Sequence, residues 1–311
     1  MKRRCFSAAA LMVLLAAPGG GPELFAPGVV STEDNEFGPA FTPDGNTLFF
    51  CRTGPTRTQT QVILYTEKRG GAWTEPKVAP FSGRYKDLDP SVSPDGRLLV
   101  FASSRPGGGR DPAREDYDLW AVDRTASGWA EPRHLGAVNS AGSETTTSIA
   151  SDGTLYLASD RPGGKGKRDL YVARPAAGGG YGDAQPLASL NTDSDDSNQW
   201  IAPDQSWMIF ASDRPGGFGA SDFYVTRRQG SEWSDPKNLG DRINDAAAVL
   251  TPVIDPSGEW LLYASFRGFA DKPLERALDF AEFRRLIRAP GNGLGDIYRI
   301  PLRALGLPVP P

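Results

Sequence analysis

Short apolar runs recur along the chain, each directly after a tight polar turn. The clearest is Trp207–Ala211, which follows Pro203-Asp204. The runs are four or five residues long and apolar on both faces, a pattern typical of strands enclosed between neighbouring sheets. The five runs are Leu48–Cys51, Leu98–Ala102, Leu155–Ala158, Trp207–Ala211 and Trp260–Ala264.

The turns mark an internal repeat that fills most of the chain. Two copies read Pro-Asp-Gly and the other three are variants of it. Such a turn allows a tight reversal because proline presets φ and glycine accepts positive φ. The spacings between successive turns are 51, 57, 52 and 53 residues, a period that suits a propeller blade. The turn residues are Asp44, Asp95, Asp152, Asp204 and Ser257.

Each repeat is predicted to hold four short strands, with the turn between the first and the second. The fourth strand begins at an aromatic residue in four copies, and we expect these rings to pack between blades rather than stack on sugars. Proline lacks the ladder donor, so the prolines at 76, 132 and 236 place the fourth strand at the outer edge. The aromatic residues are Trp73, Trp129, Tyr181 and Trp233.

The fifth repeat lacks a fourth strand, and Gly21–Val30 at the other end of the chain resembles one. We therefore predict an all-β, five-bladed propeller of four-stranded antiparallel blades, closed by its N-terminal strand. The domain would span residues 21–306, before a tail at 307–311. Its blades are predicted at 35–82, 87–138, 143–190, 195–243, and 248–302 joined by 21–30.

The last repeat carries an insertion of about twenty residues between its second and third strands. Leu274–Arg288 has no glycine or proline and places apolar residues at helical spacing. We expect a short helix on one face of the ring. Packing against the ring is the expected role, with a lid or a partner surface as alternatives.

The first twenty residues have the pattern of a signal peptide. Lys2, Arg3 and Arg4 precede the apolar run Phe6–Ala17, which is too short to span a bilayer. Cleavage is expected after Ala17 or slightly later, by the general secretory route rather than the twin-arginine route. Removing the segment would change the net charge from −4 to −7 and leave a single cysteine. That cysteine, Cys51, lies in a predicted strand and is expected to be buried and unreactive.

The turn followed by the sequence FASDRPGG, and the D-L-Y-V or D-F-Y-V of the third strand, carry a family resemblance. They resemble the Pro-Asp type of WD40-like propeller repeat found in TolB-type periplasmic propellers and in envelope proteins with OmpA-like domains. The resemblance covers residues 22–302, although the first copy lacks the Arg-Pro-Gly-Gly loop. It implies a binding or scaffolding role in the bacterial cell envelope.

Two sets of side chains are candidates for a functional site, and both belong to the end of the ring opposite the tight turns. We call this end the loop end and the other the turn end. The first set consists of arginines that begin the loop between the second and third strands, and aspartates that end it. We expect ion pairs that close each loop at its base, or else guanidinium groups that bind a carboxylate or phosphate ligand. The expected pairs are Arg105 with Asp118, Arg161 with Asp169, Arg214 with Asp222, and Arg267 with Asp296.

The second set is acidic and precedes the first strands. It could approach the channel mouth and hold calcium, which prefers several oxygen ligands, but solvated loop residues are the expected reading because no calcium-loop motif is present. The residues are Asp87, Asp89, Glu144, Asp193, Asp195, Asp196 and Asp245.

Composition and motifs narrow the possible functions. His134 is the only histidine and lies in an outer strand, which disfavours a catalytic triad or a histidine-bound zinc ion. The acidic net charge does not suggest nucleic-acid binding. We expect a monomeric periplasmic or secreted protein, without a membrane span in the mature chain, that binds an envelope protein or a saccharide. The alternatives are a carbohydrate-active hydrolase or lyase that uses channel-mouth carboxylates, and a calcium-dependent adhesion or sensor protein.

Overall fold

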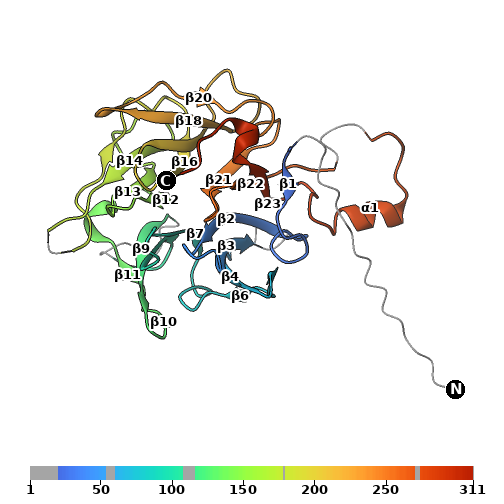
Figure 1. The fold of residues 1–311 in the computed structure, drawn as a ribbon, viewed down its shortest axis with the longest axis horizontal. Helices are drawn as coiled ribbons and strands as arrows, with labels where there is room; N and C mark the ends of the chain where they lie inside the picture. The colour runs from blue at the N-terminus through green and yellow to red at the C-terminus, as the bar shows by residue number, and fades with distance from the viewer. Residues whose placement is uncertain (1–19, 54–59, 108–115, 178, 270–273, 311) are drawn as a thin grey trace.

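The computed structural model describes residues 20–53, 60–107, 116–177, 179–269 and 274–310. The predicted signal peptide lies almost entirely outside these residues. Five antiparallel sheets surround a central axis, with the chain moving from one sheet to the next around the ring (Figure 1). The predicted five-bladed propeller is therefore confirmed.

Apart from β1, the strands of each blade come from one repeat, in order from the axis outward. The first has β2 (Asn35–Phe41), β3 (Thr47–Thr53), β4 (Val62–Arg69), β5 (Ala72–Trp73) and β6 (Lys77–Val78). The second has β7 (Asp87–Val92), β8 (Leu98–Ser103), β9 (Asp118–Thr125), β10 (Gly128–Trp129) and β11 (Arg133–His134). The third has β12 (Glu144–Ile149), β13 (Leu155–Ser159), β14 (Asp169–Ala173) and β15 (Gln185–Pro186).

The fourth blade has β16 (Asp196–Ile201), β17 (Trp207–Ser212), β18 (Asp222–Gln229), β19 (Glu232–Trp233) and β20 (Lys237–Asn238). The fifth has β21 (Val249–Ile254), β22 (Trp260–Ser265), β23 (Asp296–Pro301) and β1 (Glu23–Leu24). In three blades the outer strand is two short pieces that pair with the same neighbour. The predicted edge prolines, at 76, 132 and 236, lie in the breaks, where no ladder donor is needed.

The N-terminal strand closes the ring, as predicted. Glu23 lies opposite Arg299 and Leu24 opposite Tyr298 in an antiparallel pair. The N–H of Phe25 extends the pairing to the carbonyl of Ile297 at 2.8 Å. Because β1 comes from one end of the chain and β23 from the other, the sheet edge that would otherwise open the ring is covered.

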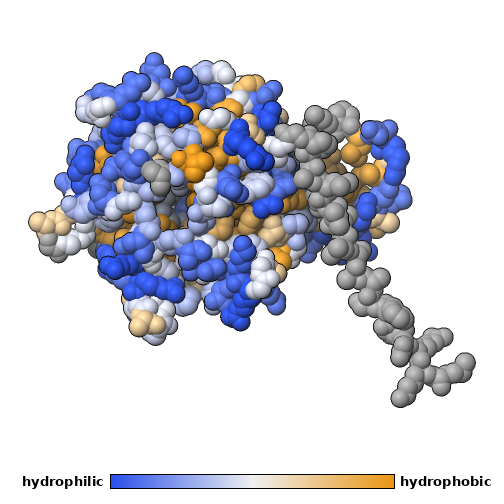
Figure 2. Space-filling view, in the orientation of Figure 1, coloured by the Kyte–Doolittle hydropathy of each residue, from blue (hydrophilic) through white to orange (hydrophobic). Residues whose placement is uncertain are grey.

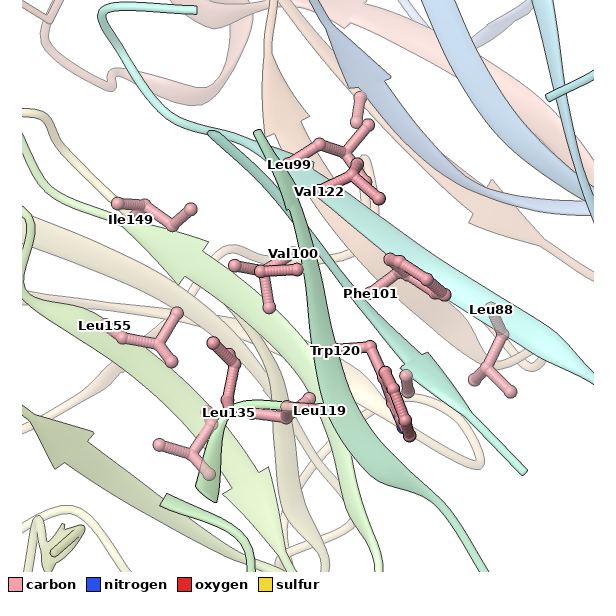
Figure 3. Close-up of a cluster of buried hydrophobic side chains, with 14 of the residues drawn as sticks. Leu88, Leu99, Val100, Phe101, Leu119, Trp120, Val122, Leu135, Ile149 and Leu155 are labelled. Carbon is pink, nitrogen blue, oxygen red and sulfur yellow. The ribbon is translucent and has the colours of Figure 1, made fainter. Parts of the chain in front are cut away.

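The core lies between the blades, where second and third strands of one sheet face the next. Figure 3 shows Leu99, Phe101 and Trp120 of the second blade in one cluster with Ile149 and Leu155 of the third. The aromatic residues of the outer strands join these contacts. The ring centroid of Trp129 is 5.8 Å from that of Phe49 in the preceding blade, and Trp73 is 6.0 Å from Phe25. The predicted packing of these rings between blades is thus confirmed.

The insertion forms α1 (Phe280–Leu286), shorter than the predicted helix. Asp279 caps it by accepting the N–H of Glu282 at 2.8 Å. None of its residues is buried, and it stands beside the ring in Figure 1. The expectation that it packs on a face of the ring is wrong, because its apolar side chains face solvent. Two 3-10 turns, Gly136–Val138 and Leu302–Leu305, complete the regular structure. Within the described residues no helix has the length and apolarity to cross a membrane.

Candidate site at the turn end of the channel

A cavity of about 400 Å³ lies on the ring axis and is lined by the first strands of all five blades. The residues of the tight turns form its rim, so it belongs to the turn end rather than to the loop end. Apolar side chains such as Val92 and Val253 alternate with polar ones such as Ser91 and Thr147 on its wall. Pro310, near the C-terminus, also contributes to the lining. This mixture suits a ligand that is partly apolar and partly hydrogen-bonding.

The deep end of the cavity is built from one unusual backbone position in each first strand. All five strands have a β-bulge there, and the bulged residue has positive φ. This conformation is strained for β-branched side chains, yet two of the five are threonine. Each bulge lies six residues before the turn residue of its repeat. The residues are Gly38 (φ 63°), Asp89 (50°), Thr146 (35°), Asn198 (53°) and Thr251 (49°).

These five residues contact one another around the axis, and we call them the channel girdle. The N–H of Gly38 donates to Thr251 Oγ1 at 3.0 Å, and that of Thr251 to Asn198 Oδ1 at 3.2 Å. The N–H of Asn198 donates to Thr146 Oγ1 at 3.3 Å, and the N–H of Thr146 favours the ionised form of the Asp89 carboxyl. Backbone donors that would face the channel unpaired are thereby satisfied by the side chain of the adjoining blade.

Cys51 completes the girdle. Gly38 has no side chain to receive the next N–H, and the N–H of Asp89 instead donates to Cys51 Sγ at 3.2 Å. A Cβ at position 38 would lie 3.2 Å from that sulfur and 3.4 Å from Asp89 Oδ1. Glycine is therefore favoured there by space as well as by φ. Cys51 is buried and has no disulfide, as expected, and burial raises the pKa of its thiol well above the usual range.

Asp89 is the carboxylate at the deep end of the cavity. Burial raises its pKa to about 6, and the N–H of Thr146 and the charge of Arg168 lower it only in part. Asp255 also lines the cavity, but it holds the last tight turn. Its carboxylate accepts the N–H of Trp260 at 3.0 Å and the hydroxyl of Ser257 at 2.6 Å. Asp89 is thus the lining carboxylate without such a turn function among the described residues.

At the loop end the two predicted sets of side chains bind each other. Each arginine pairs with the acid near the start of the first strand, not with the aspartate of the third strand. The predicted partners are therefore wrong. The observed pairs are Arg105 with Asp87 (2.8 Å), Arg161 with Glu144 (3.1 Å), Arg214 with Asp196 (2.6 Å) and Arg267 with Asp245 (2.6 Å).

Burial alone does not explain this choice of partner, because the aspartates of the third strands are buried as well. Asp169, Asp222 and Asp296 accept N–H groups of their loops instead of a guanidinium group. In three blades the inner acid is fully buried, so it requires a cation, and a serine of the second strand also donates to it. Each arginine donates further to a main-chain carbonyl of the connection before its blade, as Arg214 does to Leu190 at 3.0 Å. The arginines thus join their blades to the preceding ones. Each guanidinium group forms an ion pair within the chain.

The aspartates of the third strands still serve the base of each loop, through backbone amides. Asp222 accepts the N–H groups of Phe218 at 2.6 Å and Gly219 at 3.0 Å. Asp169 accepts the N–H of Lys165 at 2.6 Å, and Asp296 that of Gly291 at 2.7 Å. The carboxylate of Asp118 lies 3.0 Å from His134 Nε2 of the outer strand.

The remaining acidic candidates do not converge. Asp195 pairs with Arg168 at 2.7 Å, and Asp193 is exposed. Across the described residues, no three side chains of the metal-binding types come together. The described loop end therefore gives the calcium hypothesis no support.

Of the girdle, sequence reasoning singled out only Asp89, and it wrongly assigned that residue to the loop end, whereas Asp89 lines the cavity at the turn end. A signal for the other four residues was present. The five positions repeat with the same spacings as the turns, and three of them precede proline. Their residue types differ, so only the alignment of the repeats on the turn could have singled them out.

The fold and the cavity define a closed five-bladed propeller with a polar and apolar recess at one end of its axis. Among models of protein families and among curated proteins, none matches the chain. Solved structures are similar to it. TolB from Acinetobacter baumannii aligns at 16% identity with a TM-score of 0.51, over 86% of this chain and 54% of that chain. This chain thus spans about half the length of that protein.

Two further structures are similar over nearly their whole length. An α-L-arabinofuranosidase from Lactobacillus brevis aligns at 12% identity and a TM-score of 0.50, over 88% of this chain and 92% of that chain. A putative TolB from Agrobacterium tumefaciens aligns at 16% identity and a TM-score of 0.49, over 86% and 90%. At such identities the likeness shows the propeller fold and nothing finer.

Proposed function

We propose that the chain is an exported propeller of the WD40-like Pro-Asp type that binds a protein or other ligand of the bacterial cell envelope. The binding site is the cavity at the turn end of its channel. The observation that carries this proposal is the cavity itself, which lies on the axis and opens among the tight turns. Concave sites with a mixed lining on a rigid scaffold are the usual place for ligands.

The distribution of carboxylates favours binding over hydrolysis of a glycoside. Glycosidases of the common kind need two carboxyl groups that flank the scissile bond. The described lining residues include two carboxyl groups. That of Asp89 has a raised pKa, whereas that of Asp255 accepts hydrogen bonds from Ser257 and Trp260 within its own turn. The cavity thus offers one carboxyl group for acid–base chemistry.

The direct test is affinity capture from the periplasmic fraction of the native host. The bait variant Ser91→Trp places a large ring in the cavity wall, and Val78→Trp places the same ring on the exposed outer edge. A partner captured by the wild type and by the Val78 variant, but not by the Ser91 variant, supports the proposal. A partner that all three baits retain would place binding elsewhere, provided that the variants melt like the wild type.

A further inference from the structure

The insertion of the fifth blade holds most of the exposed large hydrophobic residues of the described chain. Seven large hydrophobic residues are exposed among the described residues, and four of them belong to this insertion. Phe280 is the extreme case at 76% exposure. The other three are Leu274, Phe283 and Ile287. A solvent-facing group of this kind marks an interaction surface.

The exposed side chains of α1 form a stripe. At about 100° per residue, Phe280 and Phe283 of α1 and its C-cap residue Ile287 fall within about 60° of one another around the helix axis. Arg284 and Arg288 follow on one side of this stripe. Glu282 and Leu286 lie on the opposite side and are half-buried. The helix thus turns an apolar stripe with a basic border toward solvent, and Figure 2 shows orange and blue surface together on this segment.

The basic border is not neutralised within the described chain. Glu282 pairs with Arg276, and Asp279 is engaged in capping the helix. No ion pair involves Arg284, Arg285 or Arg288 among the described residues. The chain as a whole carries a net charge of −4. Residues 274–288 hold four arginines and three acids, so this segment has a net charge of +1 in an acidic protein, and three of its arginines lie at positions 284, 285 and 288.

We propose that this insertion is a membrane-surface anchor, in which α1 lies in the interface of an anionic phospholipid bilayer. Phe280, Phe283 and Ile287 would enter the boundary between head groups and acyl chains, while the arginines contact lipid phosphates. The three arginines favour an anionic lipid surface. The capping box fixes the helix beforehand, so little order has to be gained on binding.

The expected attachment is weak and reversible, because one short helix supplies only three apolar side chains and a few charges. It should weaken with salt, since the lipid surface potential is screened within a Debye length. This inference concerns a different surface from the channel and does not depend on the binding function proposed there.

Sedimentation with phospholipid vesicles tests the anchor in the mature chain. The vesicles contain either phosphatidylcholine alone or phosphatidylcholine with about one third phosphatidylglycerol, a strongly anionic surface. The wild type should bind the anionic vesicles at least about fivefold better than the neutral ones, and salt should reduce this preference.

Two variants separate the apolar and electrostatic parts. One combines Phe280→Ser, Phe283→Ser and Ile287→Ser, and the other replaces the three arginines at 284, 285 and 288 with glutamate. Each should lose most binding, whereas Phe218→Ser, at an exposed phenylalanine of another loop, should bind like the wild type. The proposal is overturned if the wild type does not bind anionic vesicles, or if both variants bind as it does. Self-association that only the serine variant loses, without vesicle binding, would also overturn it and identify a protein contact.

Discussion

Asp89 joins the strained backbone of the girdle to the chemistry of the cavity. Its backbone has positive φ, its N–H is held by Cys51, and its carboxyl group is buried at the deep end of the channel. Because its pKa is about 6, the carboxyl group is ionised at neutral pH although burial disfavours the charge, and this lowers the free energy of unfolding. The hydrogen bonds to Cys51 and Thr146 hold Asp89 in this conformation, which its intrinsic φ preference disfavours.

The variant Asp89→Asn should reveal this cost as a pH dependence. The folded-state pKa is raised above the unfolded value, so wild-type stability falls as the pH rises from about 4 to about 6. Asparagine cannot ionise but still offers an oxygen to the N–H of Thr146. The free energy of unfolding of the variant relative to the wild type should therefore increase by about 2 kcal/mol between pH 4 and pH 7.5. Urea unfolding at both pH values measures it, and a difference independent of pH would refute the assignment.

The buried ion pairs at the loop end make a second prediction. Arg214→Gln would leave the carboxylate of Asp196 buried without its cation. Breaking such a pair should cost about 3 kcal/mol of stability. Arg227→Gln, at an exposed position of the same blade, should change stability by less than about 0.5 kcal/mol. Equal effects in chemical denaturation would show that the pair contributes little.

Among the elements, β1 closes the ring by pairing with β23. Deletion of residues 23–30 removes the pairing with β23 and the buried side chains of Phe25 and Val30. The loss should be about 4 kcal/mol or more, since a single buried phenylalanine truncation costs 3–5 kcal/mol. Val78→Ala, at an exposed outer edge, serves as the control for a minor edge change. An unaltered unfolding midpoint after the deletion would contradict closure by β1.

The elements were predictable to the extent that they follow periodicity. The apolar runs gave the second strands, the turns gave the repeat, and the unmatched segment 21–30 gave the closure. The bulges were not predictable from propensity, because positive φ in Thr146 and Thr251 goes against their preference. The ion-pair partners of the arginines could not be predicted from the sequence either. Ser103 lies opposite both Asp87 and Asp118, and both acids are buried, so neither strand position nor burial shows which of them pairs with Arg105.

At the scale of the whole molecule, the protein is predicted to be exported. Protein recovered from the periplasm should begin within residues 18–22, because the predicted cleavage follows Ala17 or one of the next four residues. Intact mass together with N-terminal sequencing measures this. A chain that keeps Met1 and stays in the cytoplasm would contradict the predicted localisation.

The central claim is that the turn end of the channel, not the loop end, holds the ligand. Photo-crosslinking in living cells compares the two ends directly. A photoreactive amino acid at Ser257 stands on the rim of the cavity, and one at Phe218 stands on an exposed tip of the loop end. The account predicts a specific adduct from position 257 and none from position 218. An adduct from position 218 alone, or from neither position, would contradict it.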